Sequence, residues 1–227
     1  MPLDATTIVQ RNALFRGLGA ETLAEIVSLS TRRSCEPGAV VFLRGDPGDA
    51  LYGVITGKVR ISVSGAGGKE VFLNIMEPGD SFGEIALLDG QPRTASATAI
   101  TQSELLVIQR DSFVALLRRE SSLALHLIRL LCQRARWTAE MMEDSALLGV
   151  PARLAKRLLS LAAMHGRPAE GGGTRLALSQ EELAQFLGLS RQIVNQHLQT
   201  WRGKGWISLG RGSVTIANER ALRNVGV

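Results

Sequence analysis

The sequence predicts an α+β protein with two folded parts: a β-barrel or roll, then a long helix leading into a group of helices closed by a β-hairpin. Three observations indicate this fold class. The chain has 227 residues, which is long for one domain and comfortable for two. Its first half contains short β-type segments separated by Gly, Pro and Asp turns. A long helical pattern occupies the middle, and further helical patterns precede a basic-tipped hairpin.

Composition excludes several classes of protein. Hydrophobic residues make up 45% of the chain and charged residues 21%, as in globular proteins with an apolar core. No apolar run is long enough to span a membrane, and residues 1–15 lack the basic-then-apolar order of a secretory signal, so we expect a cytoplasmic protein without a membrane partner. No nucleophile–base constellation is visible, so we do not expect an enzyme.

Cysteine and histidine do not indicate a metal centre. Cys35 and Cys132 are far apart, and the three histidines, His126, His165 and His197, are scattered. A metal site needs closely spaced ligands, so we expect no metal, haem or iron–sulfur cluster. Both cysteines are interpreted as small buried apolar residues.

The first thirty residues have a helical period, and the Pro37–Gly38 step ends it. Short β-type segments follow, separated by turns at 45–48, 65–68 and 77–80. They are Val40–Leu43, Tyr52–Ile55, Val59–Val63, Val71–Ile75 and Leu105–Ile108. Many short strands with regular turns are typical of a barrel or roll.

A helical pattern runs from about 112 to 148, with a break near 120–122. One stripe alternates spacings of four and three, like a heptad seam interrupted by an arginine. Its members are Leu123, Leu127, Leu130, Arg134, Trp137 and Met141. A second apolar face is formed by Leu125, Ile128, Leu131 and Ala135. If one apolar face packs on the helix's own domain, the other is available to a second copy of the chain. The pattern therefore predicts a homodimer through this helix.

The last third of the chain is basic. From Leu148 onward the sequence contains eleven lysines and arginines and four acidic residues. The preceding residues include fifteen lysines and arginines and seventeen acidic residues. Helical patterns at about 152–164 and 180–187 flank a Gly-rich loop at 171–173. A helix from about 191 to 203 and a hairpin around 210–212 follow. This is the order of a winged helix-turn-helix, and the charge suits a nucleic-acid partner.

The stretch 82–96, Phe-Gly-Glu-Ile-Ala-Leu-Leu-Asp-Gly-Gln-Pro-Arg-Thr-Ala-Ser, carries the densest chemistry. Gly83 permits close backbone approach, and 85–88 could form one helical turn. Arg93, fixed after Pro92, offers a planar fork to a phosphate. The spacing leaves an alternative open, in which Glu84 and Arg93 pair with each other on a surface loop.

This stretch resembles the phosphate-binding cassette of cyclic-nucleotide-binding domains, and 45–59 is similar to a second signature of that β-roll. With the basic helix-turn-helix behind it, nearly the whole chain resembles the CRP/FNR superfamily of bacterial regulators. The resemblance implies a cyclic-nucleotide-binding β-roll (jelly-roll-like) at 1–120, a dimerisation helix at 121–147 and a winged helix-turn-helix at 148–227. It also implies a transcriptional regulator whose affinity for double-stranded DNA is controlled by a cyclic nucleotide.

The same resemblance implies roles for single residues. Glu84 would accept a hydrogen bond from the ribose 2′-OH, Arg93 would pair with the cyclic phosphate, and Thr138 would contact the base. The full set of expected ligand-binding residues is Gly83, Glu84, Ile85, Ala86, Arg93, Thr94 and Thr138. Ala139 stands where catabolite activators of the family place a base-contacting serine, which leaves the base open. We expect cyclic AMP (cAMP) rather than cyclic GMP (cGMP).

Two capped helices form the predicted DNA-reading motif. Ser179 and Glu182 make a capping box for the first, and Ser190 caps the second. Glutamine and asparagine read adenine, and arginine reads guanine, in the major groove. The expected DNA-binding residues are Ser190, Arg191, Gln192, Asn195, Gln196, Gln199 and, at the wing tip, Arg211. The family resemblance further implies RNA polymerase as a partner if the regulator is an activator.

We expect the nucleotide to shift a two-state equilibrium at a hinge near 147–151, so that the two recognition helices of a dimer fit successive turns of DNA. Two alternatives stay open at the level of sequence. One is a regulator that binds DNA constitutively or answers another effector. The other is a cyclic-nucleotide-binding module that controls a protein partner.

Overall fold

The computed structural model describes residues 5–65 and 70–225. The chain divides into two compact units, and each is described by itself. The first contains the described residues up to Ser64 together with Leu73–Ala135, and the second contains Arg136 onward together with a short segment ending at Phe72. The helix α5 (Ser121–Leu147) is continuous, and the boundary between the two units falls inside it, between Ala135 and Arg136.

The first unit holds the β-roll apart from residues 70–72 of one edge strand, and the roll consists of two four-stranded sheets with strand orders β1-β8-β3-β6 and β2-β7-β4-β5. The strands are β1 (Ser30–Cys35), β2 (Val40–Phe42), β3 (Ala50–Thr56), β4 (Val59–Ser64), β5 (Glu70–Met76), β6 (Ser81–Phe82), β7 (Ser96–Ala99) and β8 (Ser103–Gln109). All the expected strands are present. The expected turn at 65–68 falls partly on residues outside the described ranges.

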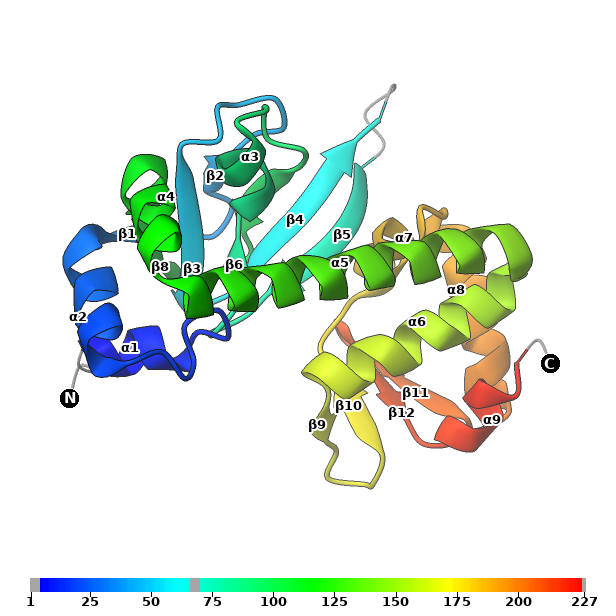
Figure 1. Ribbon diagram of the computed structural model, residues 1–227. Coiled ribbons are helices and arrows are strands. Elements are labelled where there is room, and N and C mark those ends of the chain that lie inside the picture. The colour runs from blue at the N-terminus through cyan, green and yellow to red at the C-terminus, as the bar shows by residue number, and fades with distance from the viewer. Residues whose placement is uncertain (1–4, 66–69, 226–227) are drawn as a thin grey trace. The chain divides into compact units, whose positions relative to one another are not determined.

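Helices pack on one sheet of the roll and build its larger apolar core (Figure 1). They are α1 (Ala5–Arg11), α2 (Ala20–Leu29), the short α3 (Glu84–Asp89), α4 (Arg110–Arg119) and the start of α5. Phe15, Phe113 and Leu116 are fully buried among them. The expected helix break near residue 120 is confirmed, because α4 ends at Arg119 and α5 begins at Ser121.

The apolar seam expected on α5 packs against its own unit at its start. Leu123 and Leu127 are buried in the larger core, and Leu130 and Leu131 pack on it. The sequence had placed Leu131 on the second apolar face. That placement was wrong, because Leu131 packs on the core of its own unit. The face that is exposed continues further along the helix and consists of Leu125, Ile128, Cys132, Ala135, Ala139 and Met142. Cys132 is exposed on it, so the prediction that it is buried was wrong, whereas Cys35 is buried as expected.

The second unit combines helices with a small antiparallel sheet of order β11-β12-β10-β9 (Figure 1). Its elements are α6 (Val150–His165), β9 (Arg167–Pro168), β10 (Thr174–Leu176), α7 (Gln180–Leu187), α8 (Arg191–Gly203), β11 (Ile207–Gly210), β12 (Ser213–Ile216) and α9 (Glu219–Arg223). The helices α6, α7 and α8 and the last hairpin were predicted, whereas α9 was not. The Gly-rich loop proves to join two further strands, β9 and β10, which pair antiparallel. The domain limits at 120 and 147 stay predictions.

Candidate functional site

Arg93 is a buried arginine whose guanidinium is fixed by three acceptors. It is 3% exposed. Its Nη1 donates to the carbonyl oxygen of Gly83 at 2.7 Å, and its Nη2 donates to the carbonyl of Ala50 at 2.8 Å and to Oδ1 of Asp49 at 3.1 Å. The guanidinium carbon also lies 4.3 Å from the ring centroid of Phe42. The planar fork is thus held in one orientation before any ligand binds.

Gly83 makes this arrangement possible in two ways. Its φ of 87° lies in the left-handed region, which side chains other than hydrogen rarely allow. A Cβ at this position would lie 2.8 Å from Nη1 of Arg93, which is closer than such atoms approach. The chain therefore needs glycine at 83 both for the turn into α3 and for the space that the arginine occupies.

Glu84 begins α3 and is fully buried. Its Oε1 forms an ion pair with Arg134 of α5, and Arg134 also donates to the carbonyl oxygen of Ser81. The alternative in which Glu84 and Arg93 pair on a surface loop is therefore wrong, since each has another partner and both are buried. Sequence reasoning did not assign Arg134 to the site. The signal for it was its position as the one charged member of the apolar stripe on α5.

Two buried polar atoms of this site have no hydrogen-bond partner in the described part of the chain: Oε2 of Glu84 and Nε of Arg93. A buried carboxylate oxygen requires a donor, and a buried guanidinium N–H requires an acceptor. A ligand that carries a hydroxyl group and an anionic oxygen would satisfy both. The ribose hydroxyl and the phosphate of a cyclic nucleotide have these two properties.

The other expected ligand residues are distributed unevenly. Ala86 is buried in α3 beside Glu84, whereas Ile85 is 42% exposed and Thr94 is exposed. Thr138 lies on α5 one turn after Arg134, but it belongs to the second unit. The structure thus brings Gly83, Glu84, Ala86 and Arg93 together in one unit and leaves the expected base contact outside it.

The motif predicted to read DNA forms as two capped helices. Ser179 and Glu182 make a reciprocal capping box at α7, and the hydroxyl of Ser190 accepts from the backbone N–H of Ile193 at α8. Val194, Leu198 and Trp201 are the buried stripe of α8. The exposed side chains of the opposite surface include Arg191, Gln192, Gln196 and Gln199. Asn195 is half-buried and accepts from the side-chain amide of Gln199 at 3.2 Å.

A groove lies beside the start of α8. It is lined by Leu178, Ser179, Gln180, Glu181, Arg191, Gly210, Gly212 and Ser213. These residues come from the entry to α7, the first residue of α8 and the β11–β12 hairpin. Arg211 is exposed at the tip of that hairpin. Arg191 therefore lines this groove, and Arg211 lies in the sequence between two of its lining residues, Gly210 and Gly212.

Part of the basic excess of the last third is used inside the protein. Lys156 forms an ion pair with Asp144 at 2.6 Å, Arg153 donates to Ser145 at 3.4 Å, and Arg157 is 5% exposed. The net charge counted from the sequence therefore overstates the charge available to a polyanion. Several basic side chains nevertheless remain exposed on α8, directly after it and on the wing. They are Arg191, Arg202, Lys204 and Arg211.

Comparisons with known proteins agree with both halves of this description. The cyclic nucleotide-binding domain family matches residues 32–120, and the Crp-like helix-turn-helix domain family matches residues 152–225. A relative from Mycobacterium tuberculosis, named CRP-like cAMP-activated global transcriptional regulator, is 37% identical over 217 residues, which cover 95% of this chain and 96% of the relative.

Two solved structures extend the comparison. The catabolite activator protein of Thermus thermophilus is 34% identical with a TM-score of 0.56, over 93% of this chain and 96% of that one. The regulator CLP of Xanthomonas campestris, described as responsive to c-di-GMP, is 27% identical with a TM-score of 0.74, over 87% of this chain and 99% of that one. These relatives are described as regulators and not as enzymes. Among the described residues, no helix is long and apolar enough to cross a membrane.

Proposed function

The chain belongs to the CRP/FNR superfamily of transcriptional regulators, and from this premise we propose that cAMP bound in its β-roll controls its affinity for a specific DNA site. The observation that carries the proposal is a pair of buried atoms that have no hydrogen-bond partner among the described residues, Oε2 of Glu84 and Nε of Arg93. One needs a donor and the other an acceptor, and they belong to one ligand cassette. The named activity of the M. tuberculosis relative favours cAMP as the ligand.

In this proposal Glu84 accepts the hydrogen bond of the ribose 2′-OH through Oε2, because Oε1 is already held by Arg134. Arg93 binds the cyclic phosphate with the N–H that the protein leaves unbonded, while Asp49, Ala50 and Gly83 keep its plane fixed. A fixed guanidinium loses little conformational freedom when the anion arrives. Gly83, Ile85, Ala86 and Thr94 complete the cassette, and Thr138 contacts the base.

The DNA half of the proposal places α8 in the major groove of a duplex. Arg191 and Gln192 begin that helix, and Gln196 and Gln199 follow on its exposed surface. Arginine reads guanine and glutamine reads adenine with paired hydrogen bonds. Ser190, Asn195 and Arg211 complete the interface, with Arg211 on the phosphate backbone, where a cation adds affinity but no sequence preference.

The two halves are linked through a homodimer. The exposed apolar face of α5 would pack on the same face of a second copy, and the nucleotide would favour the arrangement in which both recognition helices meet one DNA site. The joint that changes lies near 147–151. RNA polymerase would be a further partner if the regulator activates transcription.

The test begins with calorimetric titration of cAMP, cGMP and c-di-GMP into the parent protein, the Arg93→Ala variant and the Arg32→Ala control. Arg32 is an exposed arginine of the same unit, paired at the surface with Glu104. We expect cAMP to bind the parent and the control most tightly of the three, and to bind Arg93→Ala at least about a hundredfold more weakly, since a buried charged contact is removed.

The second measurement is DNA affinity with and without cAMP, by fluorescence anisotropy. The probe is a duplex recovered by binding selection from a randomised library. We expect tighter binding with cAMP and a steep loss of affinity with salt. Equal affinity in both conditions would reject the switch and leave a constitutive regulator. If calorimetry shows that c-di-GMP binds more tightly than cAMP, the pocket belongs to another effector. A DNA affinity that does not change with salt concentration would favour a protein partner.

A further inference from the structure

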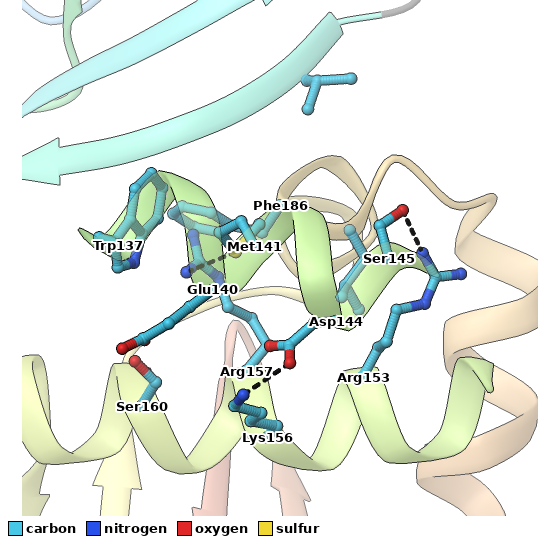
Figure 2. A pocket seen from close by; sticks show the side chains of 12 residues that line it. Trp137, Glu140, Met141, Asp144, Ser145, Arg153, Lys156, Arg157, Ser160 and Phe186 are labelled. Atoms are coloured by element: carbon cyan, nitrogen blue, oxygen red, sulfur yellow. Dashed lines mark hydrogen bonds and ion pairs between the residues drawn. The ribbon is translucent and has the colours of Figure 1, made fainter. Parts of the chain in front are cut away.

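Arg157 is a buried cation that DNA contact does not explain. It lies within α6, and Figure 2 shows it beside α5. Its guanidinium carbon is 5.0 Å from the ring centroid of Trp137 in α5 and 4.9 Å from that of Phe186 in α7. Its Nη1 lies 3.6 Å from Sδ of Met141, also in α5. One side chain thus joins three helices of the second unit.

The surroundings of Arg157 are unfavourable for a charge. Burial lowers the pKa of Arg157 to about 10, although the carboxylate of Asp144 acts in the opposite direction. The side chain is still protonated at neutral pH. Replacing a buried ion by an apolar side chain of similar size is often neutral or stabilising. Stability of the fold therefore gives no reason for an arginine at this position.

An arginine at this position is stabilised only when two neighbouring aromatic rings are both in place. A guanidinium is attracted to an aromatic face most strongly when water is excluded. At Arg157 that condition holds only while Trp137 and Phe186 both flank the charge. If either α5 or α7 moved away, the charge would lose one ring and would have to be hydrated. The contact therefore favours movement of the end of α5 and α7 as one body.

Neighbouring basic residues of α6 also contact α5, but among the described residues they form no hydrogen bond or ion pair with α7. Lys156 pairs with Asp144 and Arg153 donates to Ser145, both shown by dashed lines in Figure 2. These side chains are more exposed, so each contributes little to stability. Arg157 extends the connection to α7, which packs on the recognition helix α8.

The position of Trp137 gives the connection a direction. Trp137 is three residues after Arg134, which pairs with Glu84, and it directly precedes Thr138. We propose that Arg157 is a positioning residue that transmits occupancy of the nucleotide site from α5 to the helix-turn-helix. This inference rests on the function proposed above. Arg157 contacts neither nucleotide nor DNA in it, and acts only by holding α5 and α7 together.

The test compares the parent with Arg157→Met, Arg157→Lys and the control Lys156→Met. Methionine keeps an unbranched side chain that packs among apolar neighbours but removes the charge, and Lys156→Met removes the same charge one residue away. For each protein we would measure the melting temperature, the dissociation constant of cAMP, and the dissociation constant of the selected DNA site with and without saturating cAMP. The quantity of interest is the ratio of the two DNA constants.

We expect Arg157→Met to melt near the parent temperature and to bind cAMP with a dissociation constant within about threefold of the parent. Its DNA ratio should fall about tenfold or more toward one, because typical coupling between sites is of that size. Arg157→Lys should recover part of the ratio, since an ammonium also binds aromatic faces. Lys156→Met should keep the parent ratio.

The outcomes separate the two proposals. A parent whose DNA affinity ignores cAMP rejects the proposed switch and this inference with it. A parent that responds, combined with an unchanged ratio in Arg157→Met, rejects the role of Arg157 alone. Equal weakening of DNA binding in both conditions would also reject it, because that result describes a structural role. If Arg157→Met does not fold, Trp137→Leu removes one ring instead, and the same loss of the ratio is required.

Discussion

Glu84 and Arg134 form an ion pair between the start of α3 and the middle of α5, although they are 50 residues apart in the sequence. Glu84 is fully buried, and Arg134 also binds the carbonyl oxygen of Ser81. One carboxylate oxygen of Glu84 therefore pairs with the long helix, while the other, Oε2, is buried and has no hydrogen-bond partner among the described residues. The same side chain thus contacts the helix and leaves one oxygen for the proposed ligand.

The first prediction concerns the charge of Glu84. Glu84→Gln preserves the shape of the side chain but removes the charge from the hydrogen bond that we propose to the ribose. We expect cAMP affinity to fall about tenfold to a hundredfold, since a hydrogen bond to a charged group contributes about 1.5–3 kcal/mol. Calorimetric titration measures it. An affinity equal to that of the parent would contradict the assignment of Oε2 to the nucleotide.

The ion pair itself is tested through stability. Arg134→Met leaves the buried carboxylate without its cation, and we expect the free energy of unfolding to fall by about 2 kcal/mol, below the usual range for buried pairs because the Arg134 side chain is 29% exposed. Urea denaturation measures it. The control is Arg119→Met, which removes an exposed pair with Glu25 and should cost about 0.5 kcal/mol or less.

The second prediction concerns the space at Gly83. Gly83→Ala places a methyl group against Nη1 of Arg93 in a backbone conformation with positive φ. The matched control is Gly38→Ala, where φ is 84° and no atom lies within 4 Å of the new Cβ. Both variants should lose about 1–2 kcal/mol of stability from backbone strain. Only Gly83→Ala should also lose cAMP affinity, because it displaces the guanidinium. Equal cAMP affinities in calorimetry would show that the arginine tolerates the shift.

Where the sequence has a strong local pattern, the first and last residues of a helix or strand could be predicted from it. The helix α8 runs from Arg191 to Gly203, as expected, because Ser190 caps it and its apolar stripe is regular. The strand β1 was not predicted. Its sequence, Ser-Thr-Arg-Arg-Ser-Cys, is polar since most of it is exposed, and its pairing with β8 involves residues 68 to 78 positions away. Only that distant partner makes it a strand.

The site shows the same limit. The cassette residues lie close together in sequence, so Gly83, Glu84 and Arg93 could be named from it. Arg134 could not, because its partners Glu84 and Ser81 are brought to it by the packing of α5. Charge counting failed for a related reason. Arg157 was counted toward a DNA-binding surface, whereas the structure buries it between two aromatic rings.

The third prediction separates two arginines of the DNA interface. Arg191→Ala should reduce discrimination between the selected site and a mutated duplex by about 1–3 kcal/mol, because in the proposed interface Arg191 reads a base edge. Arg211→Ala should weaken binding to both duplexes alike and lower the slope of log affinity against log salt by about one. Anisotropy titrations at several salt concentrations measure both effects. Reversed results would exchange the roles of the recognition helix and the wing.

The fourth prediction concerns the exposed apolar face of α5. Leu125, Ile128, Cys132, Ala135, Ala139 and Met142 follow spacings of three and four, the repeat by which two helices pack side by side. Ile128 is 53% exposed and fits this repeat. In a symmetric dimer any residue near the two-fold axis meets its own copy. Ile128→Glu would therefore bury two like charges against each other.

We expect Ile128→Glu to sediment as a monomer at concentrations where the parent is a dimer. Its DNA affinity should fall by about a hundredfold or more, because the two recognition helices no longer bind as one linked pair. Gln133→Glu is the control, since it adds the same charge to the same helix outside the repeat and at an exposed position. Analytical ultracentrifugation compares the three proteins. A dimeric Ile128→Glu variant would place the contact between copies on another surface, and the DNA ratio proposed for Arg157 would then have to be explained without a symmetric pair of long helices.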